Sequence, residues 1–315
     1  MRGALVLLAC LAACQTRPAP APAPSLAARL AARLAAFRGD VGVYVRHLAT
    51  GAEFAHRADE VFPTASMIKA AIAAALLTRV DRGELDWHAE LTYTTDRRYP
   101  GEDLLGAFAD GSKVTLDKVA MLSITTSDNT AALWCQELAG GGGAVNDWLA
   151  AQGFVATRVN SRTPGREAAK AEFGWGQTTP REICELLVAA HEGRLGSPAV
   201  SDELQRLLGR VYWDGEALAA IPPWVHTLSK QGAVNASRSE VVLVQAPHGA
   251  YVFSVITNHQ HDQGWSHDNE GFVLLRDVSA LLWQHFEPQH PYTPPPGHQR
   301  FAGAGCAAPR RISRR

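Results

Sequence analysis

The chain has 315 residues, of which 46% are hydrophobic and 19% are charged, and its formal net charge is −1. This length is enough to bury the core of one large domain or of two small ones. A nearly neutral chain has no broad basic field that would attract phosphates, so we predict no nucleic-acid partner.

The N-terminus has the features of an export signal. Residues 1–2, Met-Arg, precede the apolar run ALVLLACLAAC, which is too short to span a bilayer as a mature helix. The run ends in LAAC, which resembles a bacterial lipoprotein signal with Cys14 as the lipidated residue. We predict a lipoprotein signal peptide at residues 1–13. The alternative is an ordinary signal peptide that is cut nearby. In both cases we expect an exported, periplasmic protein, and lipid at Cys14 would hold it at a membrane.

Two segments lack the periodicity of packed elements. Residues 14–25 are rich in Pro and Ala, and we expect an extended linker there. Residues 288–315 are rich in Pro, Gly and Arg, which predicts a flexible tail. The folded domain is therefore expected at residues 26–287.

Periodicity within this domain predicts helices in the middle and strands at both ends. An amphipathic helix at residues 25–37 precedes two strands at 41–58 that turn at Thr50-Gly51. A mainly helical lobe follows from about 66 to 210, with its clearest helices at 115–138 and 178–193. The late strands and the last helix are predicted at residues 226–232, 239–247, 250–258 and 272–286.

This order of elements predicts an α/β fold of the layered α+β kind. The strands from both ends would join in one antiparallel sheet flanked by helices, beside an all-helical lobe. A cleft between the sheet and the lobe is the natural place for a small-molecule site.

Cysteines and histidines give no metal-binding pattern. Cys135 and Cys184 lie in apolar helical patterns, where buried free thiols or a disulfide bridge are both open. The histidines at 259, 261 and 267 lie in a polar loop without a cysteine or a helical His pair. We therefore predict no metal site and no cofactor.

The helical lobe begins with a serine and a lysine one helical turn apart. In the tetrad Ser66-Met67-Ile68-Lys69 these two side chains share one face of a helix, and the apolar stretch AAIAAALL follows. The positive end of a helix dipole also favours a developing negative charge there. An amine beside a hydroxyl is what nucleophilic catalysis without histidine requires.

Two later motifs strengthen this interpretation. The tripeptide SDN at residues 127–129 lies in a predicted helical segment, and KQG at residues 230–232 lies on a predicted strand. Ser127 follows Ser66 by 61 residues, and Lys230 follows Ser127 by 103. This set of motifs resembles the penicillin-recognising serine hydrolases, and class A β-lactamases most closely. The resemblance covers about residues 27–287.

The resemblance implies three catalytic roles. Ser66 would attack an acyl carbonyl and form an ester. Lys69, kept partly neutral by burial and by the charge of Lys230, would accept the serine proton. Ser127, between the two lysines, would pass that proton to the leaving nitrogen.

The resemblance also implies a substrate-binding set, comprising Tyr99, Asn129, Lys230, Gly232, Ala233 and Arg238. Asn129 would bind the amide side chain of the substrate, and the backbone N–H groups of Ser66 and Ala233 would form an oxyanion hole. Lys230 and Arg238 would bind a carboxylate, with a plain surface position as the alternative for Arg238. Tyr99 would flank the entrance, with ordinary packing as its alternative.

Several positions depart from the family pattern. Gln231 stands where Thr or Ser is usual, and its longer amide would crowd the carboxylate pocket. Counting back without gaps from Pro180 puts Thr163 where class A enzymes carry the Ω-loop glutamate that activates the deacylating water. Glu167 is the candidate replacement, and Glu172 is a remoter one. Loss of a general base slows its step by roughly 10²–10⁴-fold, so we expect slow deacylation.

The arginine–aspartate pair that usually ties the Ω loop falls on Ser161 and Gly176, which cannot form an ion pair.

Three functions stay open: an exported class A-like β-lactamase, a D-Ala-D-Ala peptidase, transpeptidase or esterase of the same superfamily, and a β-lactam-binding sensor or sink. The expected substrate is thus a β-lactam or a peptidoglycan peptide. We expect a monomer.

Overall fold

The computed structural model describes residues 24–99 and 103–294. The predicted signal peptide, the lipidation site at Cys14 and most of the linker lie outside the described residues. Residues 295–315 of the expected tail lie outside them as well. The first residues of that tail, 288–294, are described, and Trp283 Nε1 donates a hydrogen bond to the carbonyl of His290 at 2.8 Å. The packed part of the chain therefore extends beyond residue 287.

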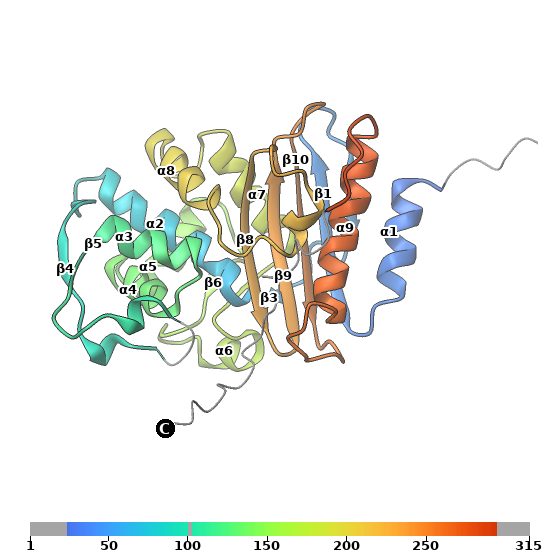
Figure 1. Ribbon diagram of the computed structural model, residues 1–315. Coiled ribbons are helices and arrows are strands. Elements are labelled where there is room, and N and C mark those ends of the chain that lie inside the picture. Colours follow the sequence, from blue (N-terminus) through green and yellow to red (C-terminus); the bar gives the residue numbers. More distant parts are fainter. Residues whose placement is uncertain (1–23, 100–102, 295–315) are drawn as a thin grey trace, which may run out of the picture.

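One five-stranded antiparallel sheet forms the centre of the molecule (Figure 1). The strands from the two ends of the domain join in it, as the order of elements predicts, and they meet where β1 pairs with β10. In spatial order they are β2 (Glu53–His56), β1 (Asp40–His47), β10 (Tyr251–Asn258), β9 (Ser237–Val244) and β8 (Thr227–Val234). Strand β8 is an edge of this sheet, and its neighbour β9 is buried along its whole length.

The helices α1 (Leu26–Ala35) and α9 (Glu270–Phe286) cover one face of the sheet, at the right in Figure 1. Their apolar stripes bury Leu30 and Leu34 of α1 and Phe272 and Trp283 of α9 in one cluster with the side chains of that face. An amphipathic helix that covers a sheet in this way gains most of its stability from burial of its apolar stripe.

The other face of the sheet joins the helical lobe. Helix α2 (Lys69–Asp81) lies at its centre, and every side chain from Lys69 to Thr78 is buried. A helix buried on all sides is typical of the core of a lobe rather than of its surface. The helices packed around α2 are α3 (Leu116–Thr125), α4 (Asn129–Leu138), α5 (Gly141–Ala151) and α8 (Pro198–Leu208).

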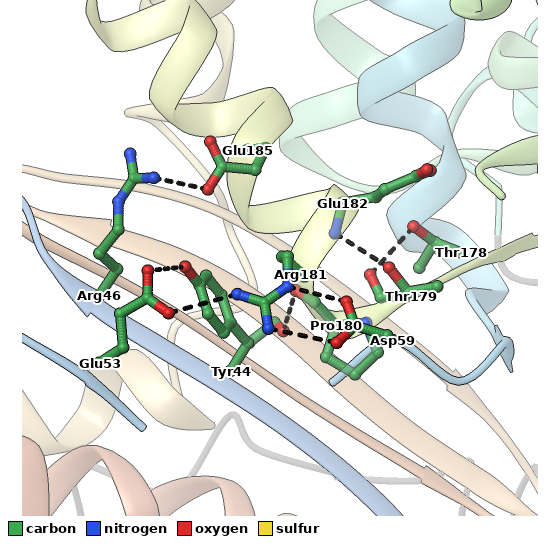
Figure 2. A network of polar contacts seen from close by, with 11 residues as sticks. Tyr44, Arg46, Glu53, Asp59, Thr178, Thr179, Pro180, Arg181, Glu182 and Glu185 are labelled. Carbon is green, nitrogen blue, oxygen red and sulfur yellow. Dashed lines mark hydrogen bonds and ion pairs between the residues drawn. The ribbon is translucent and has the colours of Figure 1, made fainter. Parts of the chain in front are cut away.

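Helix α7 (Pro180–His191) packs directly on the sheet and is tied to it by charges (Figure 2). Arg181 pairs with Asp59 at 2.8 Å and lies over the ring of Tyr44, with 4.4 Å between its Cζ and the ring centroid. The hydroxyl of Tyr44 donates to Glu53 at 2.7 Å. This network fixes the start of α7, where Thr179 caps the helix.

Short elements complete the lobe and connect it to the sheet. Strand β3 pairs with β7, β7 pairs with β6, and β4 pairs with β5. Their bounds are β3 (Phe62–Pro63), β4 (Glu90–Thr92), β5 (Lys113–Thr115), β6 (Arg158–Val159), β7 (Gly176–Thr178) and α6 (Glu167–Phe173).

The structure corrects the prediction for residues 115–138. This segment is two helices, α3 and α4, rather than one, and Ser127 lies at the break with a φ of +62°. The side chain of Asp128 accepts the N–H of Ala131 at 2.8 Å and starts a new helix. An aspartate at that position ends one helix and caps the next, because it hydrogen-bonds to the backbone locally.

Cys135 and Cys184 are both buried free thiols. Of the two predicted possibilities, free thiols or a disulfide bridge, the structure has free thiols. Burial raises the pKa of the Cys135 thiol to about 12. A thiol that stays protonated in an apolar interior is unreactive.

Within residues 24–99 and 103–294, no helix has the length and apolar character needed to cross a bilayer.

Candidate active site

Ser66 lies in a tight turn between the sheet and the helical lobe. The 3₁₀ turn η1 (Ala65–Ile68) carries it, and Lys69 begins α2 directly afterwards. Ala65 has a φ of +43°, which is rare for a residue other than glycine. Strained backbone of this kind persists only where the surroundings fix it, and it gathers at functional sites.

Two glycines allow this turn to pack closely against its neighbours. A Cβ on Gly232 of β8 would lie 2.4 Å from the Thr64 carbonyl oxygen and 2.7 Å from the Ser66 nitrogen. A Cβ on Gly176 of β7 would lie 2.6 Å from Cγ1 of Ile68. Gly232 therefore contributes through the close approach of its backbone, which places the edge strand beside Ser66.

Two lysines approach Ser127 from different elements, Lys69 from the start of α2 and Lys230 from β8. The Nζ of Lys69 lies 3.2 Å from Ser127 Oγ, and the Nζ of Lys230 lies 3.1 Å from the same atom. Lys69 also donates to the carbonyl oxygen of Ser127 and to Oδ1 of Asn129, the latter at 2.8 Å. The motifs at 66–69, 127–129 and 230–232 thus meet at one place, with the Ser127 hydroxyl between two amines.

Both lysines are fully buried, and burial disfavours their charged forms. It lowers the pKa of Lys69 to about 7, against the opposing effect of the carboxylates of Asp103 and Asp128. The pKa of Lys230 falls well below its usual value because of burial and because of the charge of Lys69. An amine with a pKa near neutrality can accept a proton at physiological pH.

The N-terminus of α4 is held by two carboxylates. Asp103 accepts the N–H groups of Asn129 at 2.8 Å and Thr130 at 2.9 Å, and Asp128 accepts that of Leu105 at 2.8 Å. Asp103 belongs to no motif and lies in a loop, so the sequence pattern does not predict it as a site residue. Together these carboxylates fix the position of Ser127 and Asn129 at the start of the helix.

A cleft of about 420 Å³ opens at this turn. Ser66, Asn129 and Ala233 line it together, so the two backbone N–H groups expected in an oxyanion hole belong to residues of one cleft. Tyr99 and Trp175 also line it, and their rings meet edge to face with centroids 5.1 Å apart. Lys69 Nζ lies 5.6 Å from the centroid of the Trp175 ring. Trp175 is a further site residue that sequence analysis missed.

The loop that includes the short strands β6 and β7, residues 158–178, forms one wall of the cleft, and it has hydrogen bonds of its own that hold it. Arg166 donates to Oδ1 of Asn160 at 2.8 Å and to Oε1 of Gln177 at 2.6 Å. Gln136 of α4 donates to the carbonyl of Ser161 at 2.7 Å. Ser161 and Gly176 form no arginine–aspartate pair, as expected from their residue types. These hydrogen bonds hold the loop instead.

The structure corrects the assignment of Glu167. This residue is exposed at the start of α6, where its Oε1 accepts the N–H of Gly165 at 3.1 Å, and it does not line the cleft. Thr163 is buried and its hydroxyl donates to the carbonyl of Ser161 at 3.0 Å. Among the described residues that line the cleft, Glu172 is the one carboxylate. The last turn of α6 therefore faces the cleft, and its first residue does not.

Arg238 is also placed differently from its prediction. Its neighbour Ser239 faces the turn that carries Ser66, and its hydroxyl donates to the Thr64 carbonyl at 3.2 Å, so Arg238 lies on the opposite face. There its guanidinium lies fully buried between the rings of Trp265 and Phe272, 4.3 and 4.6 Å from their centroids. It donates to the backbone carbonyls of Val234, Ser237 and Gly264, so the structure supports neither the plain surface position nor a contact with the cleft for Arg238.

A buried acid pair lies behind the edge strand. Glu240 faces Gln231 across the β8–β9 ladder and accepts hydrogen bonds from Ser229 at 2.6 Å and from the N–H of Ala217 at 2.7 Å. Burial raises the pKa of Glu240, and burial together with Glu240 raises that of Glu216. Gln231 itself turns its amide oxygen to Lys230 Nζ. Lys230 Nζ thus has the Gln231 amide oxygen as an acceptor besides Ser127 Oγ, and the charges of Glu216 and Glu240 oppose the lowering of its pKa.

Comparison with known proteins places this geometry in context. A model of the beta-lactamase enzyme family matches residues 25–286. The chain is 27% identical to a β-lactamase of Rhodobacter capsulatus over 77% of its own length and 83% of that protein. It is 33% identical to a β-lactamase of Streptomyces albus G, but this match covers 45% of the chain and only 47% of that relative.

Solved structures agree with the fold. The chain is similar to a β-lactamase from Sphaerobacter thermophilus, with a TM-score of 0.75 and 26% identity over 85% of this chain and 98% of that one. It is equally similar to PBP-A, with a TM-score of 0.74 and 26% identity over 87% of this chain and all of that one. The predicted layered α+β fold is confirmed. With the family match covering almost the whole described domain, the chain belongs to the beta-lactamase enzyme family.

Proposed function

We propose that this protein is a serine β-lactamase-like hydrolase that opens β-lactam rings through an acyl-enzyme at Ser66, and that it releases the acyl group slowly. The single observation that carries the first half is the Ser127 hydroxyl, held 3.2 Å and 3.1 Å from two buried amines, one of them on Lys69 directly after the turn that carries Ser66. Its family membership supports the same chemistry.

The acylation step follows from these positions. Ser66 Oγ attacks the lactam carbonyl carbon while neutral Lys69 takes the hydroxyl proton. The N–H groups of Ser66 and Ala233 bind the oxyanion that forms. The carbon–nitrogen bond of the ring then breaks, and the nitrogen receives a proton through the hydroxyl of Ser127. Lys230, the second amine at the Ser127 hydroxyl, donates a hydrogen bond to a substrate carboxylate.

Slow release follows from the wall of the cleft. Glu167 is exposed and engaged with Gly165, and Thr163 is buried without an acidic group. Trp175 places an indole ring near Lys69, where it leaves less room for water around the ester. Glu172 at the rim is the carboxylate that we propose for the remaining deacylation. Hydrolysis of the ester by water would complete the cycle.

Intact-mass measurement with penicillin G tests this proposal. Because ring opening loses no atoms, we expect each molecule to gain the full mass of the penicillin at Ser66, and the adduct to decay over many minutes. The Ser66→Ala variant is the control and should gain nothing. An absence of adduct on the parent protein under all conditions would overturn acylation at Ser66.

A second candidate, a β-lactam sensor or sink that is acylated once, is favoured by the same observation that the described loop holds no fixed carboxylate beside Ser66. A PBP-A variant among the similar structures was solved as an acyl-enzyme complex with penicillin G. An adduct that persists for hours favours this role. Hydrolysis of a D-Ala-D-Ala peptide without β-lactam turnover would instead assign the chain to the peptidases of the superfamily.

We further propose that the chain is exported to the periplasm as a monomer and anchored in a membrane by lipid at Cys14. The short apolar run and its LAAC end support this. Metabolic labelling with a palmitate analogue should mark the parent protein, and the Cys14→Ser variant should be released from the membrane fraction unlabelled. A labelled Cys14→Ser variant would contradict the anchor.

A further inference from the structure

A second cluster of chemically reactive side chains lies far from the cleft. His248 is in the turn between β9 and β10, Glu287 follows the last turn of α9, and His290 lies three residues further on. In the antiparallel register, this turn is at the opposite end of β10 from Asn258, which lines the cleft. The cluster is therefore separate from the site built on Ser66.

Glu287 is the fixed member of this cluster. Its side chain is fully buried, and its Oε1 accepts the backbone N–H of His248 at 2.8 Å. Its Oε2 lies 2.7 Å from His248 Nδ1 and 3.0 Å from His290 Nδ1. The carboxylate thus faces two imidazole nitrogens with one oxygen, while the backbone holds the other oxygen in place.

The two histidines differ from Glu287 in being open to solvent. The side chain of His248 is 54% exposed and that of His290 is 41% exposed, so an ion can reach their nitrogens from bulk water. His290 is also oriented from behind, because Trp283 Nε1 donates to its carbonyl at 2.8 Å. The arrangement has a buried anchor, two movable ligands and a path to solvent.

These atoms match the ligand set of a divalent transition metal. Two imidazoles and one carboxylate, with water in a fourth position, are a common donor set for Zn²⁺. The three ligand atoms all lie within 4.8 Å of one another. Metal–ligand bonds of about 2.0–2.2 Å put tetrahedral ligands about 3.3–3.6 Å apart, so rotation of the exposed imidazoles suffices to reach this geometry.

We propose that His248, Glu287 and His290 form a zinc-binding site that fastens the segment after α9 to the turn between β9 and β10. The ion replaces the protons that the imidazole nitrogens share with Oε2. Binding to the folded chain raises its stability, because the three ligands come together only after folding. The sequence pattern does not predict this metal site, because residues 248 and 290 are 42 positions apart and form no metal-ligand spacing along the chain.

Titration of the untagged, chelator-treated protein with ZnCl₂ tests this site. Calorimetry should give one zinc per chain, and the Tm should rise with zinc concentration and fall back on addition of EDTA. The single variants His248→Ala and His290→Ala should each weaken zinc binding at least tenfold. His56→Ala, an exposed histidine on β2, is the matched control and should bind zinc like the parent.

Cobalt gives a direct view of the ligands. Co²⁺ at the site should produce the visible absorption of a four-coordinate ion, and this absorption should be lost in His290→Ala. Acylation by penicillin G should be the same with and without zinc, because the cluster lies at the other end of the sheet. Zinc binding that neither histidine variant weakens, or no stoichiometric binding by a folded parent protein, would overturn the site. In the latter case the cluster is a hydrogen-bonded brace only.

Discussion

The surroundings of Ser127 and the loop at residues 158–178 are held in opposite ways. Around Ser127, two buried amines and the capped start of α4 leave little freedom, and each group has a partner. In the loop, Glu167 is exposed and bonded to its own turn, and the tie through Arg166 lies apart from Ser66. The first region is organised for transfer of a proton to or from serine, whereas the second places no fixed base beside the resulting ester.

Removal of Lys69 tests the organised region with the largest expected effect. We expect Lys69→Ala to slow acylation by about 10²–10⁴-fold, because a general base is lost. In the parent, the acylation rate should rise with pH and level off above about 7, since only the unprotonated amine accepts a proton. Stopped-flow acylation rates between pH 5 and 9 measure this. A rate independent of pH in this range would rule out Lys69 as the base.

Gly232→Ala should have the next largest effect. The added Cβ would lie 2.4 Å from the Thr64 carbonyl oxygen and force β8 away from the nucleophile turn. Displacing an oxyanion-hole donor costs about 10²–10³-fold in rate, so we expect a loss of that order in acylation. Gly143→Ala in α5, where a Cβ meets no atom within 4 Å, is the control and should acylate like the parent. Equal rates for both variants would show that the close approach is unimportant.

A pair of glutamates in α6 sharpens the interpretation of the loop. Glu172→Gln should slow release of the acyl group by about tenfold, less than the roughly 10²–10⁴-fold typical of a well-placed general base, because the carboxylate is exposed at the rim of the cleft. Glu167→Gln should leave release unchanged, since that side chain faces Gly165. Decay of the adduct followed by intact mass compares the two. The reverse order of effects would restore Glu167 as the base.

Arg238→Met should have the smallest effect on activity. The guanidinium serves backbone carbonyls on the α9 face, so its loss leaves buried acceptors without partners and lowers the free energy of unfolding by about 1–3 kcal/mol. Acylation by the folded fraction should stay within about threefold of the parent, a difference of under about 1 kcal/mol. Urea unfolding and acylation rates measure the two quantities. A large loss of acylation at unchanged stability would return Arg238 to the substrate site.

The sequence predicted the strands well, and it predicted the order of the three motifs along the chain. The reasons can be identified. Strands β9 and β10 combine long apolar runs with turn residues, and motif residues on η1, α4 and β8 are ordered along the chain as in the family. The face on which Arg238 lies could not be predicted, because it depends on the register of β9 against β8, and a shift of one residue reverses it.

The prediction for Glu167 was wrong for a similar reason. Helix α6 spans only Glu167–Phe173, and nothing in so short a segment sets which of its faces meets the cleft. Trp175 was missed because an aromatic residue near a glycine is common in any loop. The break at Ser127 was missed because local capping by Asp128 overrides an otherwise continuous helical pattern.

The time course of a chromogenic cephalosporin tests the difference between the two regions most directly. Mixed in excess with the protein in a stopped-flow instrument, it should give a burst of about one ring opening per Ser66, followed by a much slower steady rate set by deacylation. The Ser66→Ala variant should show neither phase. A rapid steady rate without a burst would contradict slow release, and no ring opening at all would contradict acylation at Ser66.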